Sequence, residues 1–321
     1  MKLSHFSVKE FLLSKHVEKY FGISEKAAHM KILEISVAYL LKFDKFTLLT
    51  KTRLESSPLA QYAADHWIEH ANFEGIDPVP LKLILQLFTP KSAALTNWIR
   101  INNPDGEGRN FWMDTAQLHS PLYYASLAGL HQVSTHLLEN GADVNAQGGK
   151  CGNALQAASS EGHEAIVKLL LEKGANVNAQ GGGYYNALQA ASSGGHEAIV
   201  KLLLENGAQR EQYGGALRMA SSGGHEAIVK LLLEKGADLN VQGGFHGDAL
   251  QVASLGGYQV IVELLLEKGA NVNAQGGRYG NALCAASSEG HEAIVKLLIE
   301  KGVDVNVQGG MHGNALQAAS L

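Results

Sequence analysis

The chain has 321 residues, of which 45% are hydrophobic and 18% charged, and its 26 basic and 31 acidic side chains give a formal net charge of −5. This length exceeds that of a disulfide-stapled mini-protein and accommodates two modest domains, and the composition is globular rather than disordered. Residues 120–321 hold 12 basic and 18 acidic side chains, so the clustered Lys and Arg that nucleic-acid binding requires are missing.

No apolar stretch typical of a signal peptide follows the N-terminal MKLSHFSVKEF. The longest apolar segments, such as Ile32–Phe43, contain charges and are too short to cross a bilayer. Cys151 and Cys284 are the only cysteines, and the repeat pattern described below places them four repeats apart, beyond the reach of a disulfide. We therefore expect a cytoplasmic protein with reduced thiols.

Residues 1–117 show no internal repeat, and they predict a helical lead-in domain. Ser7 and Glu10 form a capping-box pair that opens a first helix to about Lys15. A longer helix is predicted over Ser24–Phe43. Ala28, Ile32, Ile35 and Tyr39 lie on one face of this predicted helix.

Three further helices are predicted before the repeats begin. Pro58 opens a segment to residue 73 in which Leu59, Ala63 and Trp67 recur every four residues. Residues 80–87 and 91–101 are the other two helical candidates. The stretch 102–110, NNPDGEGRN, has turn composition and is the expected hinge before the second domain.

From residue 118 to residue 321 the chain repeats itself, with units starting near residues 120, 153, 186, 215, 248 and 281 and a truncated seventh unit from 314. The marker leucines of the seven starts are Leu122, Leu155, Leu188, Leu217, Leu250, Leu283 and Leu316. Their spacing is 33 residues, except for one interval of 29. This regularity predicts an all-α solenoid of stacked units.

Each unit predicts a short helix, a glycine turn, a second helix and an extended finger or hairpin. In the second unit, Leu155 faces inward from the first helix, and His163–Lys173 forms the second helix with Ile166 inward. Gly162 and Gly174 stand at the turn and at the C-terminal cap, where a left-handed residue is needed. One helix pair cannot bury its apolar face alone, so we expect stability to come from stacking.

These units resemble ankyrin repeats over about 200 residues, through the finger GANVNAQGG, the Gly-His start of the second helix and its LLLEKG end. Ser120-Pro121-Leu122 is close to that family's Thr-Pro-Leu-His opening, whereas later units read Asn-Ala-Leu-Gln, with Gln156 and its equivalents in place of the histidine. The resemblance implies an ankyrin solenoid that binds protein partners through its finger tips and the adjoining first-helix face.

Two units depart from this pattern. Between Gly207 and Leu217 the finger is four residues short and lacks the Val-Asn-Ala segment, which predicts a missing or stunted hairpin and a local kink. The chain stops at Leu321 within the first helix of the seventh unit, which we interpret as a truncated gene product or a partial chain.

A second resemblance covers residues 3–130 in patches. The segments LSHFSVKEFLLS, ISEKAAHMKILEISVAYLLKF and PLAQYAADHWIEH, followed by SPLYYASLAGL, resemble a helical stretch of fungal NOD-like receptors. In those proteins this stretch joins a NACHT ATPase to C-terminal ankyrin repeats, so the resemblance implies the ligand-sensing arm of such a receptor. The chain contains no G-x-x-x-x-G-K-[S/T] motif, and ATP hydrolysis is therefore not carried over to it.

The sharpest catalytic pattern is His66-Trp67-Ile68-Glu69-His70, which matches H-x-x-E-H. On a helix, His66 and His70 share a face and could hold zinc, with Glu69 as the base. A third ligand is needed, and Glu74 is the nearest candidate. A lead-in helix with solvent-facing polar residues explains the same pattern, so a zinc hydrolase is a remote alternative and no cofactor or resident metal is expected.

One histidine recurs at the start of the second helix in four units, as His163, His196, His225 and His291. Neighbouring copies lie a whole repeat apart, so they cannot share one metal ion. Packing at the helix start is therefore favoured over a metal ladder or a pH switch.

The finger tips vary between units while the second helices are nearly constant, and aromatic residues and Arg are frequent interface anchors. The candidate partner-binding residues at the tips are Lys150, Tyr184, Tyr185, Tyr213, Phe245, His246, Arg278, Tyr279, Met311 and His312. The first-helix row adds Tyr123, Tyr124, Arg218, Met219 and Gln251.

The sequence thus favours a non-catalytic protein-recognition module with neither a nucleic-acid nor a membrane partner. By resemblance it would be the sensing arm of a NACHT–ankyrin receptor whose ATPase domain lies elsewhere in the full-length protein. A free-standing ankyrin adaptor, scaffold or inhibitor is the alternative.

Overall fold

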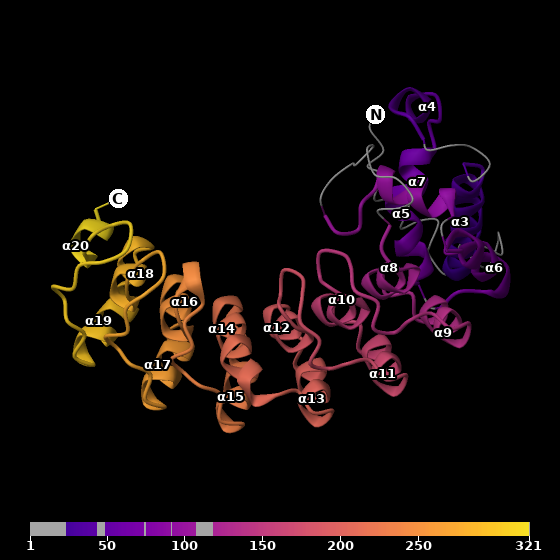
Figure 1. Cartoon of the computed structure of the whole chain (residues 1–321). Coiled ribbons are helices and arrows are strands. Elements are labelled where there is room, and N and C mark those ends of the chain that lie inside the picture. The colour runs from indigo at the N-terminus through magenta and orange to yellow at the C-terminus, as the bar shows by residue number, and fades with distance from the viewer. Residues whose placement is uncertain (1–23, 44–48, 74, 91, 107–117, 321) are drawn as a thin grey trace. The chain divides into compact units, whose positions relative to one another are not determined.

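A computed structural model describes residues 24–43, 49–73, 75–90, 92–106 and 118–320. The chain divides into two compact units, residues 1–143 and 144–321 (Figure 1). The predicted helix ending near Lys15 lies outside the described residues. The boundary near residue 117 stays a prediction about where the repeat pattern begins. Within the described ranges, no helix is long and apolar enough to cross a membrane.

The first unit is built from helices alone in its described part. They are α3 (Glu25–Leu41), α4 (Lys51–Glu55), α5 (Ala60–Ala71), α6 (Pro78–Leu87), α7 (Ala93–Ile101), α8 (Pro121–Leu127) and α9 (His131–Glu139). The helices predicted from Ser24, Pro58, Pro80 and Lys91 are therefore present, with ends shifted by a few residues. Helix α4, which begins at a Thr50 cap, was not predicted because it spans only five residues.

The apolar row of Ala28, Ile32, Ile35 and Tyr39 is not the buried face of the longest helix. Helix α3 buries Met30, Leu33, Val37 and Leu40 against α5 and α6, and Ile35 is 54% exposed. Both sides of this helix carry apolar residues, so spacing alone did not decide which side would be covered.

Aromatic rings form the centre of the first unit. The rings of Trp67 and Trp98 lie 5.2 Å apart between centroids, and Phe88 lies 6.2 Å from Trp67. Tyr124 of α8 lies 6.4 Å from Trp98. All four side chains are fully buried, so the first repeat of the sequence pattern packs into the same core as the lead-in helices.

The second unit stacks helix pairs side by side. The first helices are α10 (Ala154–Ser160), α12 (Ala187–Ser193), α14 (Tyr213–Gly223), α16 (Ala249–Leu255) and α18 (Ala282–Ser288). The second helices are α11 (Glu164–Glu172), α13 (Glu197–Glu205), α15 (Glu226–Glu234), α17 (Gln259–Glu267) and α19 (Glu292–Glu300), and α20 (Ala315–Ala318) follows them. Figure 1 shows the first helices in one row and the second helices in a parallel row.

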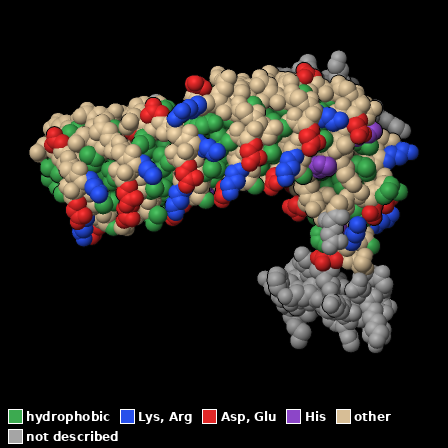
Figure 2. Space-filling model, turned by 90° about the horizontal axis from the view of Figure 1, so that it is seen from below, with side chains coloured by type: hydrophobic (Ala, Val, Ile, Leu, Met, Phe, Trp, Pro, Cys, Tyr) green, Lys and Arg blue, Asp and Glu red, His purple; other side chains and the backbone are tan. Residues whose placement is uncertain are grey.

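The second-helix row carries the charged face of this unit. Glu and Lys pair at i and i+4 on α11, α13, α15 and α19, and Figure 2 shows acidic and basic side chains recurring together along this face. Such exposed pairs contribute little to stability. They mark this row as the solvated side, whereas Ile166, Val167 and Leu170 and their equivalents face the core.

Local chemistry sets the ends of each helix pair. Asn153 caps α10 by accepting a hydrogen bond from the Gln156 backbone N–H at 2.9 Å. Gly162 has φ +80° and Gly174 has φ +85°, as their predicted left-handed positions require. The short helices therefore begin and end where the sequence pattern predicts.

The recurring histidines join neighbouring pairs. The Nε2 atom of His196 lies 3.0 Å from the Ser160 carbonyl oxygen of the preceding unit, and His225 and His291 make the same contact one and three units later. A Cβ on Gly162 would lie 2.5 Å from the His196 ring, so glycine makes room for it. This is the packing role favoured by the sequence.

The fold is all-α, as predicted. In the described part of the chain, β-structure is confined to two isolated bridges, Gln147 with Asn153 and Gly276 with Gly280, which close fingers. In the described residues, Cys151 and Cys284 are buried and neither forms a disulfide.

Candidate protein-binding surface

Four of the described full fingers close through a glycine-to-glycine hydrogen bond, and in the fifth the Gly181 N–H donates to the Tyr185 carbonyl. The Gly148 N–H donates to the Gly152 carbonyl at 2.7 Å, and the Gly276 N–H donates to the Gly280 carbonyl at 2.9 Å. The same bond closes the fingers that begin at Gly243 and Gly309. Gly276 and Gly280 have positive φ, which lets the chain turn tightly and hold the intervening side chains out at the tip.

Asparagines at the finger bases tie successive fingers together. The Asn145 side chain accepts a hydrogen bond from the Asn176 N–H at 2.7 Å and donates to the Gly174 carbonyl at 3.2 Å. Asn178 and Asn273 make equivalent pairs of bonds to the following unit. These hydrogen bonds join the base of a finger to the unit that follows it.

Gln156 acts as a further tie in place of the family's histidine. Its Nε2 donates to the Gly181 carbonyl of the next finger at 3.0 Å, and Gln251 does the same to the Ala274 carbonyl at 3.1 Å. Gln251 is buried for this reason, and its predicted place in the contact row is wrong.

Three fingers bring their tips into one surface patch. The Arg278 N–H donates to the Phe245 carbonyl at 2.7 Å, and the Met311 N–H donates to the Arg278 carbonyl at 2.8 Å. We call this patch the C-terminal tip cluster, and its six members are Phe245, His246, Arg278, Tyr279, Met311 and His312.

The side chains of the C-terminal tip cluster also contact one another. The Arg278 guanidinium carbon lies 5.5 Å from the Phe245 ring centroid and 5.6 Å from that of Tyr279. The Tyr279 and His312 rings lie 5.8 Å apart. Phe245 is 62% exposed and Met311 is 53% exposed, so the cluster offers apolar and cationic groups to solvent together.

The tips nearer the start of the array are arranged differently. The Gly183 N–H donates to the Lys150 carbonyl at 2.8 Å, and Lys150 is exposed. Tyr185 is 66% exposed and holds φ +66°, a left-handed conformation that is unusual for a bulky residue. Tyr184 is half-buried, and this burial raises the pKa of its hydroxyl.

Tyr123 and Tyr124 do not belong to an exposed first-helix row. They are 1% and 0% exposed, and the Tyr123 hydroxyl donates to the Asp105 carboxylate while Tyr124 packs on Trp98. Helices of the lead-in cover this face of α8, so the prediction that these two residues contact a partner is wrong. Arg218 and Met219 of α14 are both half-buried.

Tyr213 is not at a finger tip either. The short finger folds into a 3-10 turn, Arg210–Gln212, and a longer α14 that begins at Tyr213 itself. The stunted hairpin was therefore predicted, but the helical replacement was not. The Tyr213 hydroxyl donates to the Ala208 carbonyl at 3.1 Å.

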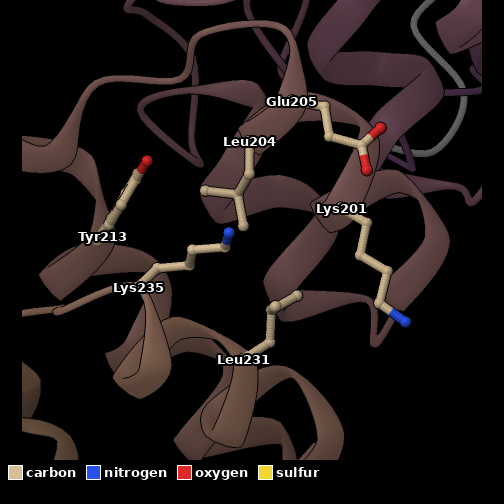
Figure 3. Close-up of a pocket in the computed structure, with 6 residues that line it drawn as sticks. All are labelled: Lys201, Leu204, Glu205, Tyr213, Leu231 and Lys235. Carbon is tan, nitrogen blue, oxygen red and sulfur yellow. The ribbon is translucent and has the colours of Figure 1, made fainter.

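Tyr213 instead lines a hollow of about 340 Å³ on the second-helix side (Figure 3). Leu204, Glu205 and Lys201 of α13 and Leu231 of α15 form its walls with Lys235. Its polar groups are one carboxylate, two ammonium groups and a phenol whose hydroxyl is already bonded. These groups do not form a nucleophile–base pair that could begin acyl transfer.

The zinc pattern of α5 gains no further ligand in the described residues. His66 faces Glu69 at 3.5 Å, whereas Nδ1 of His70 lies 2.8 Å from Nδ1 of His29. Glu74 lies outside the described residues. Across the described ranges, no three His, Cys, Asp or Glu side chains converge as a metal site would require.

Comparison with known proteins agrees with this geometry. The family of ankyrin repeats, in three copies, matches residues 95–181, 155–243 and 217–309. Azaphilone pigments biosynthesis cluster protein L from Monascus ruber is 38% identical over 181 residues, which cover 50% of this chain and only 38% of that relative.

Two solved structures match this chain. The human ASB11 ankyrin repeat domain is 28% identical with a TM-score of 0.55, and the match covers 62% of this chain and 91% of that chain. The ankyrin repeat domain of Bcl-3, a unique member of the IkappaB protein family, is 26% identical with a TM-score of 0.49. That match covers 62% of this chain and 93% of the Bcl-3 chain.

Proposed function

The chain belongs to the ankyrin-repeat family, and from this premise we propose that it recognises a protein partner through the C-terminal tip cluster. Ankyrin repeats are protein–protein interaction modules, which sets the class of function. The choice of surface depends on one observation, the joined tips of Phe245, Arg278 and Met311. Their side chains are exposed and have no role in the core, and Phe and Arg are frequent anchors of interfaces.

The distribution of charge supports this choice. Lys150 and Arg278 are the exposed charged residues among the full finger tips, and Asp248 is 2% exposed beneath its own tip. The second-helix face holds its acidic and basic groups in pairs with each other. A partner that approaches the tips therefore meets exposed cations, one of them beside aromatic rings, whereas the opposite face offers acidic and basic groups in pairs.

Site-specific photo-cross-linking in cells that naturally make the protein tests this surface. A benzoyl-phenylalanine replaces Phe245 in one variant, and it replaces Val260 of α17, which is 49% exposed, in the matched control. We expect one dominant protein adduct from position 245 and none of that mass from position 260. Equal adducts from both positions would count against the tip surface.

The partner identified in this way allows a quantitative test. The triple variant Phe245→Ala, Arg278→Ala and Met311→Ala should weaken its binding at least about tenfold, since truncation of anchor residues commonly costs more than 1 kcal/mol. The free energy of unfolding should change by no more than about 1 kcal/mol, because exposed side chains contribute little to it. Undiminished binding by a folded triple variant would refute the proposed surface.

We further propose that the array is the sensing arm of a larger receptor and works in the cytoplasm. The lead-in residues that resemble fungal NOD-like receptors support this. Transcript sequencing across the gene is the test. A reading frame that continues upstream into a phosphate-binding loop is expected, and transcripts limited to residues 1–321 would favour a free-standing adaptor, scaffold or inhibitor instead.

A further inference from the structure

The row of fingers is interrupted at the third unit of the sequence pattern. In the described array, backbone hydrogen bonds link the tips at Lys150 and Gly183, and those at Phe245, Arg278 and Met311, but none links Tyr185 to Phe245. The short finger between them has become the extended start of α14. We call the space between the tips at Tyr185 and Gly243 the finger gap.

Two adjacent glycines let α14 extend into this position. A Cβ on Gly214 would lie 2.3 Å from Cγ2 of Val241, and a Cβ on Gly215 would lie 2.4 Å from Nε2 of Gln189. Contacts this close exclude any larger residue without movement of a neighbour. The two glycines therefore admit the start of this helix between the neighbouring units.

Polar groups around the short finger lack the partners that the regular units supply. Gln189 is equivalent to Gln156, and Oε1 of both side chains is buried and unbonded in the described structure. The Gln156 amide nitrogen bonds the next finger, whereas no such bond is made by that of Gln189 there. Gln212, just before α14, is 6% exposed, and neither its amide oxygen nor its nitrogen has a partner there. Unsatisfied buried amides are uncommon and costly in native proteins.

Arg218 is the charged member of this gap. Its side chain lies along Gly243, where a Cβ would be only 2.2 Å from the guanidinium Nε. The Nε atom is buried without a hydrogen-bond partner, although the residue as a whole is only half-buried. Burial lowers the pKa of Arg218, and the charge of the nearby Tyr185 hydroxyl opposes this effect.

This guanidinium has no counter-ion within the described part of the array. Arg218 forms no ion pair there, although a partly desolvated charge is normally balanced by an opposite one. The other two arginines of the array differ, because Arg210 donates to the Gly236 carbonyl and Arg278 lies on the exposed Phe245 and Tyr279 rings. The finger gap thus presents a positioned cation without a partner.

We propose that the finger gap binds the side-chain carboxylate of an aspartate or glutamate on the protein partner, with Arg218 as the recognising group. This inference rests on the proposed function, in which a protein meets the finger tips. One guanidinium balances the single charge of a carboxylate and offers it paired N–H donors. A phosphate group carries up to two charges, so one arginine would leave an unbalanced charge in a partly desolvated place.

Arginine side-chain NMR tests the proposal on the whole chain. The Nε–Hε resonance of Arg218 is assigned by its loss in Arg218→Lys, and it is followed during titration with the capped tripeptide acetyl-Gly-Glu-Gly-amide. Acetyl-Gly-Gln-Gly-amide and inorganic phosphate are titrated in parallel. We expect a saturable shift with the glutamate peptide, binding at least about tenfold weaker with the glutamine peptide, and only small, linear shifts at Arg278.

A geometric variant separates position from charge. Gly243 has φ −110°, which alanine also adopts, so Gly243→Ala should fold but push the Arg218 side chain out of place while keeping its charge. We expect this variant to lose the saturable shift with the glutamate peptide. The triple variant of the C-terminal tip cluster should retain it, so failure of that surface and failure of the finger gap are distinguishable.

Three results would overturn the proposal. The first is the absence of a saturable shift at Arg218. The second is an equal response to the glutamine peptide, which would show that the site does not distinguish a charged carboxylate from a neutral amide. The third is tighter binding of phosphate than of the glutamate peptide, because the site would then recognise a different anion. Unchanged binding by a folded Gly243→Ala variant would count against the geometry as well.

Discussion

Replacing Gly162 by alanine should expose the cost of the contact between neighbouring units. The substitution forces a Cβ into a left-handed residue with φ +80° and places it 2.5 Å from the His196 ring. Left-handed strain alone costs about 1 kcal/mol. Displacing His196 also breaks its contact with the Ser160 carbonyl at 3.0 Å, worth about another 1–2 kcal/mol with the lost packing. The expected loss is about 2–3 kcal/mol.

Gly174→Ala is the matched control, because Gly174 has φ +85° and no atom within 4 Å of the added Cβ. It should cost only the strain, about 1 kcal/mol. Urea unfolding followed by far-UV circular dichroism measures both variants, with unchanged m-values as the check on cooperativity.

A double-mutant cycle identifies the clash itself. In a His196→Ala background the ring is gone, so Gly162→Ala should cost no more than Gly174→Ala does in the wild type. Equal losses from the two glycine variants in the wild-type background would refute the reasoning, and so would strict additivity in the cycle.

Other contacts carry further expected outcomes. Asn145→Ala removes both bonds to the next finger and should lower the free energy of unfolding by about 1–2 kcal/mol, measured by urea titration against Asn145→Asp, which keeps one acceptor. Trp98→Ala should cost about 3–5 kcal/mol, seen as a lower thermal midpoint, because the ring is fully buried. Two causes lower the pKa of His70 below its ordinary 6.5. Burial is the larger cause, and the charge of His29 is the second. The unfolded chain therefore binds that proton more readily, and stability should fall as pH drops below about 6.5. In His70→Gln, the urea midpoint should depend less on pH between pH 7.5 and 5 than it does in the wild type. An equal pH dependence in the variant and the wild type would contradict this assignment.

The repeat architecture could be derived from the sequence because each unit contains the residues that set its own helix ends and turns. Asn153, Gly162 and Gly174 set the ends and turns of a helix pair through backbone geometry within about 20 residues. Because the units are nearly identical, they stack in the same way, and a closing glycine makes the same turn in four of the described full fingers. Phe245, Arg278 and Met311 were predicted as contact residues because the tips vary between units, and the structure leaves all three exposed.

The incorrect predictions concern burial that depends on residues distant in the sequence. Tyr123 and Tyr124 match the contact row of an internal unit, but the lead-in rings, Trp98 among them, cover the first unit of the pattern. The buried face of α3 also could not be read from spacing, because only the packing of α5 and α6 selects between its two apolar sides. Burial of this kind depends on which element arrives from elsewhere in the chain.

The sequence alone determined the solenoid, its period and its variable tips, since these follow from local periodicity repeated along the chain. Only the tertiary structure decided what fills the shortened finger, because that depends on the units on both sides. Tyr213 lies on the second-helix side, and Arg218 lies along Gly243 without a counter-ion among the described residues. The sequence shows that the finger is four residues short, but the packing of the neighbouring units determines the shape of the space that this leaves.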